Sequence, residues 1–105
     1  MQYAIKVAIF AASLSSAALA QQYRPHLSEM IEADNGARYA VDLNTARHFG
    51  PVVEAGIYDQ GRGGIVPMMF DCHGHAGPLG GTMSQTPPRS VGARLAAIAC
   101  AAARP

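Results

Sequence analysis

Tryptophan is absent from this sequence, lysine occurs only at Lys6, and cysteine occurs only at Cys72 and Cys100. Charged residues make up 14% of the 105 residues, and the eight basic and seven acidic side chains leave a formal net charge of +1. Nucleic acids and anionic membrane surfaces attract proteins with a basic excess, so this balance argues against both as partners. The length allows one domain at most.

The first twenty residues have the pattern of an export signal. Lys6 precedes an uncharged run from Val7 to Ala20, which ends in Ala-Leu-Ala before the polar Gln21. Signal peptidase accepts small residues in this spacing, and the run is too short and too rich in Ala and Ser for a transmembrane helix. We therefore predict a signal peptide over residues 1–20. The mature protein is expected in the periplasm or secreted to the cell surface, with no membrane span.

Removal of this signal would leave 85 residues that contain all 11 Gly and all 7 Pro. A chain of this size buries only about 60–65% of its unfolded surface, so a covalent cross-link would add much to its stability. In an exported protein two cysteines allow one disulfide, which predicts a bridge between Cys72 and Cys100. The alternative, in which Cys72 is a nucleophile or a metal ligand, requires a free thiol.

Residues 29–42 predict a first β-hairpin with its turn at Asn35 and Gly36, because an Asn-Gly pair tolerates the positive φ angles of a tight turn. The residues that follow, 42–47, predict a turn or a single helical turn capped by Asp42 or Asn44. The sequence therefore places a reversal of the chain directly after the first hairpin.

Residues 51–72 predict a second hairpin, whose strands are joined by a turn at 59–64 that holds three Gly. In its second strand Pro67 has no amide hydrogen to donate, so this strand is predicted to lie at an edge or to have a break there. Residues 73–86 contain four Gly and one Pro, which predicts a loop or a poor strand around 81–84.

One helix is predicted, from Val91 to Ala103, with Ser90 as a favourable N-cap and Arg104 near its C-terminal dipole. Its apolar stripe follows helical spacing and consists of Val91, Leu95, Ile98 and Ala102. At 100° per residue Cys100 lies about 160° from the centre of this stripe. Either the last turn unwinds, or the Ala-rich helix buries more than one side.

Strands followed by one helix favour an α+β fold, in which a small antiparallel sheet carries the C-terminal helix on one face and one disulfide links the two. The predicted organisation is a flexible arm over residues 21–28 and a single domain over 29–105.

Several short motifs follow one another in a recognisable order: Tyr39-Ala40-Val41-Asp42, the turn at 43–47, Ile57-Tyr58-Asp59, Phe70-Asp71-Cys72, and Pro88-Arg89-Ser90-Val91-Gly92 with Leu95 and Ile98-Ala99-Cys100. In this order they resemble the bacterial surface-adhesin E family, over roughly residues 30–101. The resemblance implies a curved antiparallel sheet and a C-terminal helix tied to it by a disulfide, which falls on Cys72 and Cys100.

Members of that family bind host matrix and plasma proteins such as vitronectin, laminin and plasminogen. This chain differs from the family pattern in having no Trp, a short stretch between Tyr58 and Cys72, and no cysteine for a lipid anchor. These differences bear on host adhesion more than on the fold.

The segment around His73 and His75 is the richest in chemistry. Two histidines that are two residues apart on a strand point to one face, where they could share a metal ion. A tight site would need a further ligand from His26, His48 or Asp71. The simpler interpretation is a surface pair of histidines beside a glycine loop.

The resulting hypothesis is an exported, non-enzymatic, adhesin-like binding protein that recognises a macromolecular partner, either a host matrix protein or a periplasmic protein. The sequence indicates no cofactor and does not locate the binding residues. An exposed sheet face or edge, such as Pro51–Tyr58 or the strand with Pro67, would bind the partner or form a homodimer. The alternative is a periplasmic metal-binding protein that uses His73 and His75.

Overall fold

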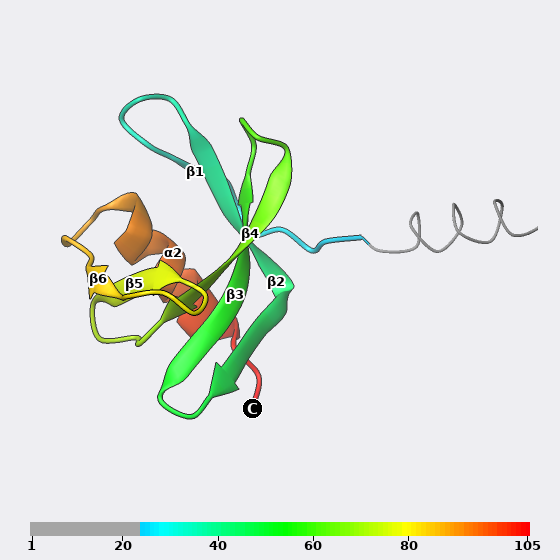
Figure 1. Ribbon diagram of the computed structural model, residues 1–105. Helices are drawn as coiled ribbons and strands as arrows, with labels where there is room; N and C mark the ends of the chain where they lie inside the picture. Colours follow the sequence, from blue (N-terminus) through cyan, green and yellow to red (C-terminus); the bar gives the residue numbers. More distant parts are fainter. Residues whose placement is uncertain (1–23) are drawn as a thin grey trace, which may run out of the picture.

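A computed structural model describes residues 24–105 (Figure 1). The predicted signal peptide and residues 21–23 of the predicted arm lie outside the described residues. The described chain forms one antiparallel sheet whose strands are neighbours in sequence order, followed by a helix. The elements are β1 (Ile31–Glu32), β2 (Arg38–Phe49), β3 (Val52–Asp59), β4 (Gly64–Phe70), β5 (His75–Pro78), β6 (Ser84–Gln85) and α2 (Val91–Ala102).

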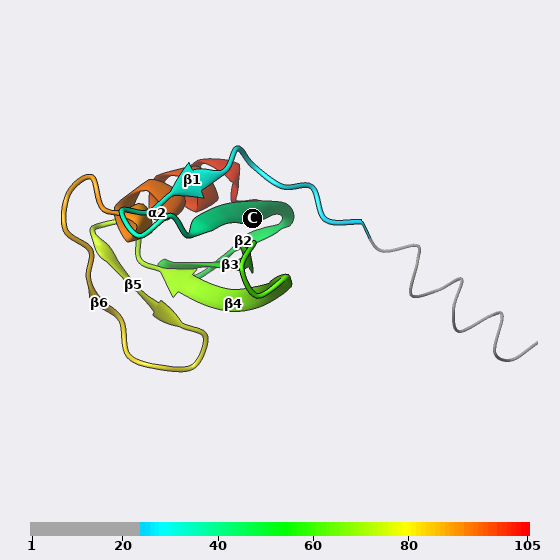
Figure 2. The same cartoon turned by 90° about the horizontal axis from the view of Figure 1, so that it is seen from above.

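The sheet curls, and α2 lies against one of its faces, which we call the inner face (Figures 1 and 2). On β3 the inner face carries Val53, Ala55 and Ile57, all buried against Leu95 and Ala99 of the helix in one core. The other side of the sheet, which includes Glu54, Gly56 and Tyr58, is the outer face. The predicted α+β fold, with a curved antiparallel sheet, a packed C-terminal helix and one disulfide, is confirmed.

The outer edge of β2 is covered by three separate segments. β1 pairs with β2 at Tyr39 and Arg38, and the backbone of residues 26–28 continues along the same edge, where the N–H of Ser28 donates to the carbonyl of Val41 at 2.8 Å. At the far end of β2 the N–H of Arg104 donates to the carbonyl of Ala46 at 3.1 Å. The last residues of the predicted flexible arm are therefore hydrogen-bonded to the sheet.

Residues 42–47 continue β2 as a bulged strand, so the predicted turn or helical turn is wrong. Asp42 pairs with Gly56 and Arg47 pairs with Glu54, which leaves four residues of β2 opposite the single Ala55. β2 thus has three extra residues, and an odd number reverses which face each following side chain points to. Val41 and Ala46 therefore both face the core. The bulge buries Asp42 completely, and its Oδ1 accepts from the backbone N–H groups of His26 and Asn44, each at 3.2 Å.

The two predicted hairpins are present, with Gly36 and Gly63 at positive φ in their turns. β3 lies between β2 and β4, so Pro51–Tyr58 provides no edge, and that part of the prediction is wrong. β5 pairs with β4 only from Met68 to Phe70, so the half of β4 that contains Pro67 has no further strand beside it. Of the two predicted alternatives, an edge or a break at Pro67, the structure has the edge. β5 and β6 form within the segment predicted as a loop.

The helix begins after Ser90, whose side chain accepts from the N–H of Ala93 at 3.1 Å, as predicted. It continues without unwinding to Ala102, so Cys100 is part of its last turn. Ala93, Ala96 and Cys100 form a second flank that faces the loop with Cys72. The small alanine side chains let the helix pack against the core on one side and against this loop on the other. Of the two alternatives left by the sequence, the helix therefore buries more than one side, and its last turn does not unwind.

Candidate functional site

A groove of about 420 Å³ opens on the inner face beyond the N-terminal end of α2. Tyr39 and Ile57 line it from β2 and β3, Val66 and Met68 from β4, and Val91 and Leu95 from the helix. Along each strand, residues two apart point to the same face of the sheet. Side chains from three neighbouring strands therefore meet on the inner face. Its walls are therefore predominantly apolar.

The groove exists because α2 covers only part of the inner face. Along β4 the inner-face side chains become steadily more exposed, from the buried Phe70 through the half-buried Met68 to Val66, which is 42% exposed. The 12 residues of α2 span about 18 Å, whereas the eight residues of β3 extend over about 26 Å. A helix of this length leaves one end of the sheet without a cover.

One ion pair stands at the rim of the groove. Asp59 is the last residue of β3, and its Oδ1 accepts from the N–H groups of Gly61 at 3.0 Å and Arg62 at 3.3 Å in the turn that follows. Its Oδ2 lies 3.7 Å from Nε of Arg62, whose side chain is 82% exposed. An exposed pair of this kind adds little stability, but it places a charge of each sign beside an apolar surface.

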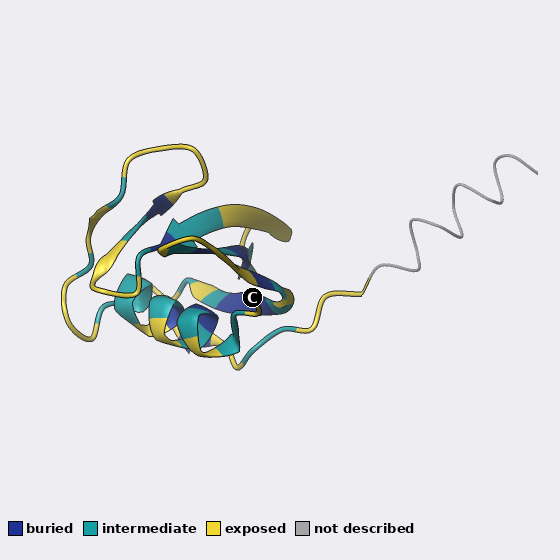
Figure 3. Ribbon diagram, turned by 90° about the horizontal axis from the view of Figure 1, so that it is seen from below, coloured by how far each residue is buried: buried dark blue, intermediate teal, exposed yellow. Residues whose placement is uncertain are grey.

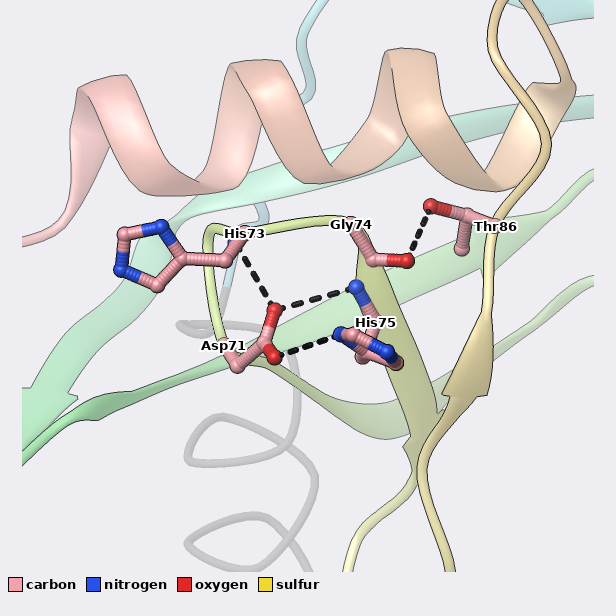
Figure 4. Close-up of polar contacts among 5 residues, drawn as sticks. All are labelled: Asp71, His73, Gly74, His75 and Thr86. Atoms are coloured by element: carbon pink, nitrogen blue, oxygen red, sulfur yellow. Dashed lines mark hydrogen bonds and ion pairs between the residues drawn. The ribbon is translucent and has the colours of Figure 1, made fainter.

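A second structured region is the loop between β4 and β5 (Figure 4). It contains Cys72, one half of the disulfide. Cys72 and Cys100 are bonded with their Cα atoms 6.0 Å apart, as predicted. Cys72 has φ of +63°, an unusual conformation for a residue with a side chain. A hollow of about 330 Å³ lies between this loop and the Ala93 flank of the helix.

Asp71 organises this loop. Its Oδ1 accepts from the backbone N–H groups of His73 at 2.8 Å and His75 at 3.0 Å, and its Oδ2 lies 2.8 Å from Nδ1 of His75. The N–H of His73 is the main cause that holds the pKa of Asp71 below its ordinary value of 3.8, with His75 adding to the effect and partial burial opposing it. The carboxylate thus fixes the backbone around Cys72.

The structure does not bring the two predicted metal ligands together. The ring of His73 points away from that of His75, and Nδ1 of His75 is engaged by Asp71 (Figure 4). In the described part of the chain no three His, Cys, Asp or Glu side chains converge as a metal site would require. Metal binding through His73 and His75 therefore has only the sequence pattern behind it.

None of the residues that line the groove was predicted from the sequence to bind a ligand. One signal was nevertheless present, because the apolar alternation of Val66, Met68 and Phe70 extends along a strand that a helix of the predicted length would not cover fully. Among residues 24–105 no helix has the length and hydropathy that crossing a bilayer requires.

Comparisons with protein-family models, with curated proteins and with solved structures find no match to this chain. The resemblance to surface-adhesin E proteins therefore stays a prediction from sequence motifs. The groove must be interpreted from its own shape and chemistry.

Proposed function

We propose that this chain is an exported, non-enzymatic binding protein that captures a segment of a partner protein in the groove on its inner face. The observation that carries the proposal is the exposure of Val66 and Met68 on the face that elsewhere forms the core. Apolar core-facing side chains gain free energy when a partner removes them from water, at about 25 cal/mol per Å² of apolar surface. A partner side chain would complete the layer that α2 leaves unfinished.

The shape and charge of the groove favour a protein segment as the ligand. Its walls are apolar, and Asp59 and Arg62 at the rim offer one charge of each sign. Interfaces between proteins commonly combine an apolar centre with a polar rim that sets orientation. A segment with one large apolar side chain flanked by charged residues fits this arrangement, with the apolar side chain between Met68 and Leu95.

Export and an adhesin-like role rest on two further observations. The Cys72–Cys100 disulfide is a type of bond that persists outside the reducing cytoplasm. A disulfide-tied helix on a curved sheet is also the architecture implied by the resemblance to surface-adhesin E proteins, whose targets are host matrix and plasma proteins. These observations support proteins in or beyond the periplasm as the partners.

The proposal can be tested with defined probes and two adjacent substitutions. A displayed peptide library and immobilised vitronectin, laminin and plasminogen would be tested for saturable binding to the oxidised protein. Val66→Asp should weaken the binding of any captured ligand by roughly 30-fold or more, as expected for an anchor residue. Ile65→Asp is the matched control, because Ile65 is similarly exposed, at 37% against 42% for Val66, but lies on the outer face.

Circular dichroism would first confirm that both variants are folded. Binding that survives Val66→Asp unchanged would overturn the groove as the binding surface. Failure of all these peptides and proteins to bind the wild-type chain would contradict the proposal itself.

A further inference from the structure

The outer face of the sheet is unusually apolar for a face that no helix covers. An antiparallel sheet with one free face normally alternates apolar and polar side chains, with the polar ones toward water. Here Ile65 and Leu79 are exposed by 37% and 45%, and Pro67 of β4 is exposed beside them. We call Ile65, Pro67 and Leu79 the outer patch.

Figure 3 shows α2 against one side of the sheet. The outer patch lies on the other side, around Gly56. Gly56 forms the floor of a shallow hollow of about 220 Å³, with Thr45, Ile65, Pro67 and Leu79 around it. The helix α2, the one helix formed by residues 24–105, packs on the inner face only. Contiguous exposed apolar surface of this kind marks an interaction site.

The charges beside the outer patch are arranged so that the surface complements itself. Arg47 of β2 lies directly opposite Glu54 of β3 in the register of the sheet. Arg38–Glu32, Arg62–Asp59 and His75–Asp71 are within ion-pair distance, whereas Arg47 and Glu54 are not paired with each other. Both are thus available, side by side, to groups from outside the chain.

We propose that the outer face binds a second copy of this chain in a two-fold symmetric dimer. In such an interface the same surface occurs on both partners, so a patch of a single charge would repel itself. A neighbouring pair of opposite charges avoids this, because Arg47 of each copy faces Glu54 of the other. Residues 24–105 carry seven Arg and seven carboxylates, so no net repulsion opposes the association of two copies.

The interaction uses the face of the sheet, not its edge. The open half of β4 is Gly64–Pro67, which pairs with no further strand of the described chain. The carbonyl of Pro67 points away from β3, because it accepts from the N–H of Leu79. The backbone N–H and carbonyl of Ile65, two residues earlier on the same strand, point the same way. Since Pro67 has no N–H, this edge offers too few donors to pair with another strand.

Sedimentation equilibrium of the oxidised protein recovered from a periplasmic expression host tests the proposal. The wild-type chain should have the mass of a dimer in a concentration-dependent equilibrium. Ile65→Glu should raise the dimer dissociation constant by roughly 30-fold or more. Val66→Glu should leave it unchanged, because Val66 lies on the inner face.

Charge reversal provides a test that does not depend on a disruptive substitution in the apolar patch. Arg47→Glu and Glu54→Arg should each weaken the dimer, since each creates repulsion across the symmetry axis. The double variant Arg47→Glu/Glu54→Arg should recover the wild-type dissociation constant. A monomeric mass at every protein concentration, or a dimer that is indifferent to both single reversals, would overturn the proposal.

The outcome is independent of the groove on the inner face. A monomer that still captures peptides in a Val66-dependent manner would remove the dimer and leave the proposed function intact. A dimer that fails to bind any of the peptides and proteins would support the dimer and contradict the proposed function.

Discussion

The backbone N–H of Gly56 on β3 donates to the hydroxyl of Thr45 in the β2 bulge at 2.7 Å. The same hydroxyl donates to the carbonyl of Asp42 at 2.7 Å. Thr45 thereby replaces the ladder bond that the bulge removes, and it anchors the segment that buries Asp42. The bulge that Thr45 bridges reverses the alternation of the second half of β2 and puts Ala46 in the core.

Thr45→Val should lower the free energy of unfolding by about 1–3 kcal/mol, because it leaves the half-buried N–H of Gly56 and the carbonyl of Asp42 without this partner. Chemical denaturation followed by circular dichroism measures the loss. Thr45→Ser keeps the hydroxyl and should retain most of the stability. A loss in Thr45→Ser as large as that in Thr45→Val would contradict this account, because serine keeps the hydroxyl and lacks only the methyl group.

Gly56→Ala should also destabilise the protein, by about 1–3 kcal/mol. A Cβ at this position would lie 2.6 Å from Cγ2 of Ile65 and 3.2 Å from Oγ1 of Thr45. The double variant Gly56→Ala/Ile65→Ala removes the closer contact and should be less destabilised than the sum of the two single variants. Additive losses, measured by the same denaturation experiment, would contradict this account.

Reduction of the Cys72–Cys100 disulfide should lower the free energy of unfolding by about 3.5 kcal/mol, the loop-entropy estimate for residues 28 positions apart. Thermal unfolding with and without dithiothreitol measures this effect. The double variant Cys72→Ser/Cys100→Ser should be destabilised to a similar degree and should not respond to the reductant. An unchanged melting temperature for the reduced wild-type chain would mean that the bridge does not stabilise the helix on the sheet.

Asp71 should make the stability of the protein depend on pH in the acidic range. Its pKa is lowered in the folded state, so the carboxylate contributes stability above its ordinary pKa of 3.8, and this contribution is lost as the pH falls through the lowered value. Asp71→Asn should therefore be less stable than the wild type near neutral pH, with a difference that shrinks in acid. Urea denaturation at a series of pH values measures it.

His73→Ala is the control for that experiment, because Asp71 accepts from the backbone N–H of His73 and not from its ring. This variant should keep the pH profile of the wild type. A profile for Asp71→Asn that runs parallel to the wild type down to the most acidic samples would show that Asp71 does not couple pH to stability.

Local signals were sufficient for the two hairpin turns, the helix start and the disulfide. The turn at Gly36 and the N-cap at Ser90 involve contacts between residues no more than four apart, so the sequence near each determines the outcome. The bridge between Cys72 and Cys100 followed from the compartment and from the fact that only one pairing exists. These predictions did not require knowledge of the fold.

The β2 bulge and the covered edge of β2 were beyond local reasoning. Polar residues from Asp42 to Arg47 are typical of a turn when they are considered alone. They continue a strand because residues 26–28 and Arg104 supply hydrogen bonds to that strand from opposite ends of the domain. Such contacts join residues 13 or more positions apart, and no local pattern specifies them.

By itself the sequence determined that a small antiparallel sheet carries one disulfide-tied helix, because alternation, turn residues and two cysteines act within short stretches or allow only one choice. Only the tertiary structure decided which apolar side chains stay uncovered. Val66 and Ile65 are adjacent and both apolar, yet one lies in the groove and the other on the outer patch. Alternation along the strand puts them on opposite faces. That both stay exposed depends on where α2 packs, which is set by the core as a whole.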